Sequence, residues 1–525
     1  MARRLNCLWL RALAVLVIEH QVAWAGGPLG DNGSKIQTSS YAIDISVGPV
    51  LGGARMTGLG GAYVAIAEDV DGDLQNPAAP AVRPFYSVDW FDWWPGFGMT
   101  FPALADLDYF NTGERDEDSR APSTFLFLTP ALNLQWGDFG VGLTAEFQKY
   151  SADTGSLLEN TLDTNILTVH AQFANSFLDG QLVAGFGTRI VTLTLVEGHE
   201  RGSEEERSAD EQAEFQSTGS GLEFGVLIRP NWQPFRVGAS FRGPVDTQPY
   251  FTSGLLPNAN GDLVVEDEAG ARFYYPNRVS LPWDLNVGAA YQFGRPLNPR
   301  WRAPKDVARK QELQLDLRRI ELEEARNHDL TRAKSEAERE RIKAKFEAQS
   351  NAIDKAIDEG RAEGRLQLNR DLAALPRFYF LISASLLLTG VVEDAVGMES
   401  YFDQVVRRSG ERVTFSPRLG VETEALPDLM KVRAGTYLEP ARAANAAHRG
   451  HFTFGLDFRL FRWNVFGFWP SDYLWRVGLV ADVAPRYATW GISIGGWYPR
   501  HRPEDLPPAN GALTDLMAPT GDGED

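Results

Sequence analysis

Three aspartates at alternate positions, Asp69, Asp71 and Asp73, have the spacing that most directly suggests chemistry. Carboxylates in this arrangement are typical of the first half of a calcium-binding loop. The glycine expected at the sixth position of such a loop is missing, and Pro80 occupies the twelfth position instead of a glutamate. We therefore predict no metal site in this segment.

The other chemistry-bearing residues form no catalytic pattern. No histidine belongs to an H-E-x-x-H motif, and His448 and His451 are predicted to lie in a surface loop. The chain has no phosphate-binding glycine loop. We predict no enzymatic activity, no catalytic residues and no cofactor. A lipid hydrolase stays open as an alternative, because residues from separate strands could form its site without a local motif.

The composition excludes several classes of protein. A net charge of -19 over 525 residues opposes binding to nucleic acid phosphates. A mean hydropathy of -0.26 leaves no room for a bundle of membrane helices.

Cys7 is the only cysteine and lies in the first 25 residues. We expect these residues to be a signal peptide, because Arg3 and Arg4 precede an apolar run and Ala23-Trp24-Ala25 is typical of a cleavage site. The mature chain would then have no disulfide.

From Phe85 onward, apolar and polar residues alternate in runs of about ten, the length of a tilted strand crossing an outer membrane. Between Phe139 and Gln148, every second residue is apolar, and the intervening residues are glycine, polar or charged. About fourteen such runs begin near Phe85, Ser123, Phe139, Thr164, Leu182, Phe215, Phe235, Pro282, Arg377, Arg412, Leu429, His451, Leu474 and Arg486.

Charges recur on the strand faces opposite the apolar ones, and aromatic residues gather at strand ends, as the interfacial girdles of membrane barrels require. The charged residues include Glu146, Arg189, Glu223, Arg242, Arg418, Glu422, Arg433, Asp457 and Asp482. These features favour a membrane barrel over a soluble β-sandwich. We predict an all-β membrane protein, an antiparallel transmembrane β-barrel of about 14 strands in the outer membrane of a Gram-negative bacterium. It would be a monomer in contact with outer-membrane lipid and lipopolysaccharide.

Connection lengths support this topology. The connections near Gly137-Asp138, 179–180, 231–234 and 425–428 are short, whereas 106–120, 197–214, 249–280 and 393–410 are longer. Short periplasmic turns that alternate with long outer loops are the pattern of outer-membrane barrels.

One connection, residues 302–376, is instead dense in Glu, Arg, Lys and Ala. We expect a coiled-coil-like helical insertion, with one helix from about Lys305 to Ser350 and a shorter one after Asn351. Strand parity places it on the periplasmic side. The thin apolar seam would comprise Leu313, Leu317, Ile320, Leu330, Ala337 and Ala344. Two interpretations stay open: a solvated hairpin that pairs only with itself, or an arm whose helices, within 305–374, bind a periplasmic partner.

The glycine-dense segment Gly52–Pro80 carries a family resemblance. Gly53-Ala54-Arg55-Met56, Gly60-Gly61-Ala62-Tyr63-Val64-Ala65 and Asn76-Pro77-Ala78 resemble the N-terminal signature of the FadL-type long-chain fatty acid transporters and their PorV-like relatives. Residues 416–422 and 431–437 resemble C-terminal strands of that family. The resemblance implies a fourteen-stranded barrel, an N-terminal hatch and diffusion of hydrophobic compounds. The hatch residues would be Gly53, Arg55, Gly58, Gly60, Gly61, Asn76, Pro77 and Ala78.

The predicted organisation is a signal peptide (1–25), a hatch (26–84), strands one to eight (85–301), the helical insertion (302–376), strands nine to fourteen (377–498) and a disordered tail (499–525). The expected function is passive uptake of hydrophobic small molecules similar to long-chain fatty acids or hydrocarbons. The alternative is a non-transporting PorV-like scaffold or shuttle in protein secretion or surface attachment. Apolar residues expected in loops could give a ligand access, unless they serve loop packing or the aromatic girdle: Trp93, Trp94, Phe97, Met99, Phe101, Phe251 and Leu255.

Overall fold

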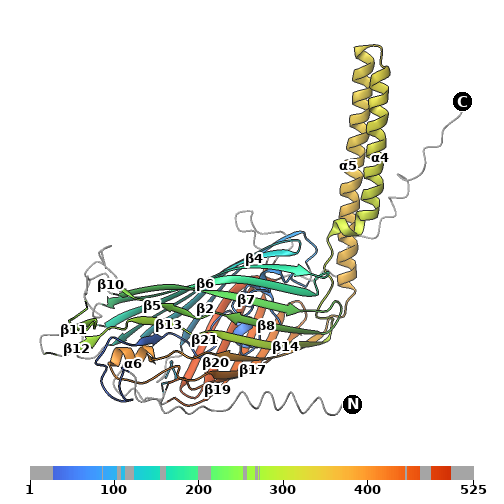
Figure 1. Cartoon of the computed structure of the whole chain (residues 1–525). Helices are drawn as coiled ribbons and strands as arrows, with labels where there is room; N and C mark the ends of the chain where they lie inside the picture. The colour runs from blue at the N-terminus through green and yellow to red at the C-terminus, as the bar shows by residue number, and fades with distance from the viewer. Residues whose placement is uncertain are drawn as a thin grey trace, which may run out of the picture.

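The computed structural model describes residues 28–85, 87–102, 108–112, 123–153, 161–198, 215–251, 257–266, 270, 272–443, 446–461 and 474–497. Within them, fourteen antiparallel strands close into a barrel (Figure 1). The wall strands are β2 (Phe91–Pro102), β3 (Ser123–Trp136), β4 (Phe139–Asp153), β5 (Thr161–Phe177), β6 (Leu182–Gly198), β7 (Phe215–Ile228), β8 (Phe235–Arg242), β14 (Asp284–Gly294), β15 (Tyr379–Thr389), β17 (Thr414–Leu426), β18 (Met430–Glu439), β19 (Arg449–Arg459), β20 (Leu474–Ala484) and β21 (Tyr487–Trp497). The pairing of β2 with β21 joins the first and last wall strands. The predicted signal peptide and tail lie outside the described residues.

The barrel is apolar outside and polar inside, which follows from the two-residue period of its strands. Large apolar side chains are exposed on the outer face, among them Phe139, Leu143, Phe173, Phe186, Leu222, Phe224, Phe415, Phe452, Phe454 and Trp490. The alternate positions are polar and buried, among them Thr144, Gln148, Gln172, Glu223, Arg236, Glu422, Arg433, Asp457 and Asp482. The predicted barrel is therefore confirmed, with the faces that the alternation indicated.

The two ends of the barrel differ. One end, which we call the turn end, carries the short connections at Gly137-Asp138, 179–180, 231–234 and 427–429, together with the start of β2 and the end of β21. The helices α4 (Pro304–Arg332) and α5 (Glu336–Ala373) join β14 to β15 at this end and project from it (Figure 1). The opposite end, the loop end, carries most of the long connections. None of the helices in the described residues combines the length and apolarity that a membrane span needs.

The boundary predicted inside the helical insertion is wrong. The first helix ends at Arg332 instead of Ser350, because Ser335 starts a new helix by accepting a hydrogen bond from the Glu338 amide at 3.2 Å. The predicted seam is wrong for five of its six residues: Leu313, Leu317 and Ile320 are 62%, 54% and 53% exposed, and Ala337 and Ala344 are exposed as well. Leu330 is half-buried, as predicted, together with Leu315 and Leu322 of α4, while α5 buries Ile353, Ala356 and Ile357.

A small sheet fills the loop end of the barrel. Its strands are β16 (Ala395–Val396), β1 (Ala42–Asp44), β13 (Arg278–Leu281) and β9 (Val245–Thr247), in that order. Helix α6 (Met398–Asp403), the short strand β10 (Tyr250–Phe251) and the hairpin β11 (Val264–Glu266)–β12 (Arg272–Tyr274) lie around it. An apolar core joins this cap to the wall strands and includes Ile43, Phe127, Tyr150, Val191, Phe215, Phe273 and Tyr401.

Candidate functional site

The Gly52–Pro80 segment lies inside the barrel, where nearly all of it is buried. It forms three short helical turns, α2 (Ala54–Gly58), α3 (Asp69–Asp73) and η1 (Ala79–Ala81). Glycines let its backbone touch the wall closely. A Cβ on Gly60, whose φ is +61°, would lie 2.9 Å from the backbone nitrogen of Thr436 on β18. On the wall side, a Cβ on Gly185 of β6 would collide with the carbonyl of Pro77. The segment therefore occupies the position predicted for a hatch, and we call it the hatch from here on.

A chain of buried ion pairs fixes the hatch to the C-terminal strands. Arg55 donates two hydrogen bonds to the Glu422 carboxylate, from Nε at 2.9 Å and from Nη2 at 3.0 Å. Glu422 also accepts from Arg433 at 2.5 Å, and Arg433 donates to Asp457 at 2.6 Å. Asp457 accepts in turn from Arg476 at 2.9 Å. We call these five residues, together with Glu68 and Arg236, the ion network.

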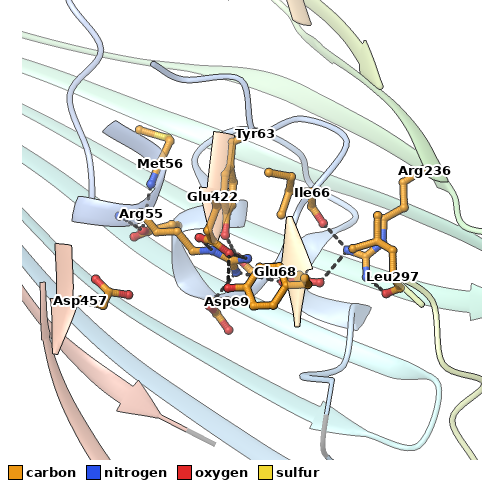
Figure 2. Close-up of polar contacts among 12 residues, drawn as sticks. Arg55, Met56, Tyr63, Ile66, Glu68, Asp69, Arg236, Leu297, Glu422 and Asp457 are labelled. Carbon is orange, nitrogen blue, oxygen red and sulfur yellow. Dashed lines mark hydrogen bonds and ion pairs between the residues drawn. The ribbon is translucent and has the colours of Figure 1, made fainter. Parts of the chain in front are cut away.

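Glu68 extends this network to the opposite wall, as Figure 2 shows. It lies 2.9 Å from Arg55 and 2.8 Å from Arg236 of β8. Arg236 also donates to the carbonyls of Ile66 and Leu297, at 2.7 and 2.9 Å (Figure 2). Burial alone would raise the pKa of Glu68, but Arg236 and Arg55 lower this pKa to about 2. The hatch is thus bound electrostatically to both sides of the barrel.

The three aspartates that resembled a calcium loop have separate structural partners. Asp69 lies 3.3 Å from Arg55, and Asp71 accepts hydrogen bonds from the Arg55 and Met56 amides at the start of α2. Asp73 accepts from Asn133 at 3.2 Å and Thr144 at 3.3 Å in the wall. Their carboxylates therefore organise the hatch itself.

The predicted hatch residues Asn76 and Pro77 contact the wall directly. The Asn76 side chain donates to the Val64 carbonyl at 2.8 Å and to the Val226 carbonyl of β7 at 3.2 Å. Its oxygen accepts from the Ala78 amide at 3.0 Å. Asn76 therefore closes the turn of the hatch and links it to the wall.

A cavity of about 200 Å³ lies between the hatch and the wall strands, on the loop side of the ion network. Apolar side chains form one part of its lining, among them Ile45, Val47, Phe127, Ile166, Val191, Leu281 and Leu387. The other part is charged and consists of Glu146, His170, Arg189, Arg242, Asp284 and Arg418. The cavity could therefore accommodate a molecule with one apolar and one polar part.

Beside this cavity, two neighbouring strands leave the wall together. Strand β8 continues through Gly243-Pro244 into β9, and β13 continues through Pro282-Trp283 into β14. The pairing register is continuous, with Arg242 opposite Asp284 and Val245 opposite Leu281. Beyond the bend, β13 pairs with the buried strand β1.

A Cβ added to Gly219 or Gly221 of β7 would meet Val245, so β9 packs against β7. Among the described strands, none pairs with residues 217–221 of β7 on this side.

Arg189 of β6 holds this bend. Its Nη2 donates to the carbonyls of Gly243 and Pro282, at 2.7 and 2.9 Å, so it contacts both bent strands. Its Nη1 lies 3.3 Å from Asp284. The sequence indicated Arg189 as a lumen charge, but its contact with the bend was not predicted. The only signals were the prolines of Gly243-Pro244 and Pro282-Trp283, and these were weak, because proline also occurs within wall strands, as Pro130 does in β3.

The loop position predicted for the apolar ligand-access residues is wrong for five of the seven. Trp93, Trp94, Phe97, Met99 and Phe101 belong to wall strand β2. Trp94 is buried, whereas the other four alternate with inward-facing residues and therefore point outward. Phe251 lies in β10 and pairs with Phe215 of β7. Leu255 lies outside the described residues. Contact of these residues with a ligand stays a prediction.

No family model and no characterised protein matches this sequence. Among solved structures, the chain is similar to the CymD monoaromatic hydrocarbon channel, with 11% identity, a TM-score of 0.41 and coverage of 87% of this chain and 99% of that one. It is also similar to a FadL homologue from Pseudomonas aeruginosa, with 10% identity, a TM-score of 0.41 and coverage of 89% and 100%. Because the TM-scores are below 0.5, the fold assignment here depends on the strand pairing and not on these neighbours.

Proposed function

We propose that this protein is an outer-membrane channel through which hydrophobic small molecules, similar to hydrocarbons or fatty acids, pass without an energy source. The observation that carries the proposal is the bend of β8–β9 and β13–β14 out of the wall, next to a partly apolar cavity. The ion network and the hatch obstruct the barrel axis with charged and packed groups, and an apolar solute gains nothing by crossing them. The bend offers a lateral path that avoids them.

The route begins at the loop end, continues through the cavity and leaves the barrel beside residues 217–221 of β7. Next to this gap, β7 presents the apolar side chain of Leu222 to the outside. An apolar solute that reaches this gap could enter the hydrocarbon layer directly, where its transfer is favourable. The hatch would not have to leave the barrel.

Uptake of radiolabelled toluene tests this function in a Gram-negative host that lacks its own hydrophobic-compound channels. We expect the wild-type chain to increase the uptake rate. The Gly221→Phe variant should remove most of this increase, since a side chain there would meet Val245 and the Pro244 carbonyl within the gap. Gly450→Phe is the matched control, because no atom of the described residues lies within 4 Å of a Cβ at that position. Uptake by the wild type no faster than by the empty host would contradict the channel function.

The alternative function is a non-transporting scaffold or shuttle for secreted or surface-attached proteins. The exposed Leu313, Leu317 and Ile320 on α4 favour it, because such a stripe on a projecting helix suits binding to another protein. In that case, we propose that the helices bind a periplasmic protein. Replacing all three residues by Gln should release surface proteins into the medium if the scaffold function holds, while toluene uptake stays unchanged.

A further inference from the structure

Arg418 of β17 lines the cavity and has no carboxylate partner in the described part of the chain. It is 8% exposed. Its hydrogen bonds are long: Nε to the Ser416 hydroxyl at 3.5 Å, and Nη1 to the Gly61 carbonyl at 3.4 Å and the Gln75 side-chain oxygen at 3.5 Å. Hydrogen bonds from arginine are ordinarily between about 2.7 and 3.2 Å. A buried guanidinium is costly unless an anion lies beside it. The observed surroundings of Arg418 lack such an anion.

The other charged groups of the cavity are already paired. Glu146 lies 3.2 Å from His170, which also lies 3.0 Å from Glu223. Asp284 is shared by Arg189 at 3.3 Å and Arg242 at 3.9 Å, and Arg242 lies 3.1 Å from Glu223. The described lining thus holds three arginines and two carboxylates, and Arg418 is the arginine that pairs with neither carboxylate. One additional negative charge would complete the pairing.

The dimensions of the cavity limit the size of such an anion. An engineered apolar cavity of about 150 Å³ is known to hold benzene. The present cavity, of about 200 Å³, therefore accommodates one ring and a carboxylate. A long acyl chain would extend far beyond it. Phe127, Ile166, Val191 and Leu281 would surround the apolar part.

We propose that this cavity binds small amphiphilic acids, with one ring or a short alkyl chain, and that Arg418 receives their carboxylate. The planar guanidinium can donate two parallel hydrogen bonds to a carboxylate, a geometry that a neutral solute does not match. The proposal depends on the channel function and narrows its substrate class from hydrophobic molecules in general to those with a single anionic group.

Calorimetric titration of the purified full-length protein in detergent tests the proposal, with benzoate as the probe and benzamide as its neutral analogue. We expect benzoate to bind at least about tenfold more tightly than benzamide, because hydrogen bonds to a charged group contribute more than neutral ones. The Arg418→Gln variant should lose this preference, and Arg418→Lys should retain part of it. Arg377→Gln is the control, since Arg377 pairs with Asp428 at the turn end, 2.8 Å away.

Thermal stability separates a ligand-binding role from a structural one. Because Arg418 forms no ion pair with any described residue, Arg418→Gln should unfold at the same temperature as the wild type or a higher one. A clear drop in that temperature, or equal binding of benzoate by wild type and Arg418→Gln, would overturn the proposal. Absence of benzoate binding by the wild type would do the same and would indicate a cavity that holds only water. If toluene uptake persists in that case, the channel function stands without this substrate class; if uptake is also absent, both proposals fail.

Discussion

At the scale of single residues, the ion network explains why the sequence motifs occur together. Arg55 belongs to the N-terminal signature, whereas Glu422 and Arg433 belong to the two phrases near the C-terminus. In the folded chain the Glu422 carboxylate lies between the two arginines. A buried charge without a partner is costly, and Arg55, Glu422 and Arg433 of these motifs supply partners for one another.

Glu422→Gln should strongly destabilise the folded protein. The substitution leaves Arg55 and Arg433 buried without their shared carboxylate, and breaking a buried pair in this way costs roughly 3–5 kcal/mol. We expect a lower temperature for the heat-induced mobility shift on gels. Arg272→Gln is the control, because its pair with Glu266 is more than half exposed and solvent screens the attraction. Equal shifts in both variants would contradict an energetic role for the network.

Acid should weaken the attachment of the hatch only at low pH. The folded-state pKa of Glu68 is about 2, below the value of roughly 4.3 for an unperturbed glutamate. A depressed pKa contributes stability that is complete above the unfolded value and lost as pH falls through the folded value. We therefore expect Glu68→Gln to be less stable than the wild type at pH 7, with the difference constant down to about pH 4.5 and vanishing near pH 2. Unfolding temperatures across this range would check the prediction. A difference already lost at pH 5 would disagree with it.

Residue types and positions indicated which face of each strand is charged, but not which charges meet. The alternation from Phe139 to Gln148 was sufficient to place Phe139 outside and Thr144 inside. The pairing of Arg55 with Glu422 joins residues 367 positions apart and depends on strand register and tilt around the whole ring. A local pattern carries no information on register or tilt. The sequence could therefore predict that charged side chains lie inside the barrel, but not which of them form ion pairs.

At the scale of elements, glycine and proline decide where the chain bends and where backbones touch. Gly60 and Gly61 have φ values of +61° and +71°, which residues with a side chain rarely adopt. The bend in the wall depends on Gly243-Pro244, which precede the loop predicted at 249–280, and on Pro282-Trp283, where a strand was predicted to start. Similarly, Ser335 and Glu338 have the spacing of a helix N-cap, but the charged residues around them continue the helical pattern and hide the break.

Gly60→Val should disturb the hatch and leave the barrel intact. A Cβ at this position would lie 2.9 and 3.0 Å from the Thr436 backbone, which belongs to wall strand β18 and has little room to move. We expect a normal mobility shift on boiling and a higher permeability of whole cells to a polar dye. Gly450→Val meets no neighbour in the part of the chain that the structure describes and should change neither property. Failure of Gly60→Val to assemble would mean that the segment belongs to the folding unit of the wall.

At the scale of the whole molecule, the helical hairpin contacts the barrel where the hatch leaves it. The Arg83 guanidinium lies over the Trp301 ring, 4.1 Å from its centre, and Arg365 of α5 forms an ion pair with Asp89. Arg83 also donates to the Trp90 and Gly137 carbonyls of the wall. Hatch, wall and hairpin therefore meet at one junction, and a force on the hairpin would reach the end of the hatch.

Replacing residues 304–373 by a short flexible linker separates the two functions considered for this protein. The hairpin makes its main contacts with itself, and the strands β14 and β15 that flank it are paired along their full lengths. The shortened chain should therefore still close into a heat-modifiable barrel. If the lateral path beside the bend is the route, toluene uptake should stay within about twofold of the wild type, because that path lies at the other end of β14. Loss of uptake with an intact barrel would instead mean that the junction at Arg83 controls the hatch, and that the hatch, not the wall, is the gate.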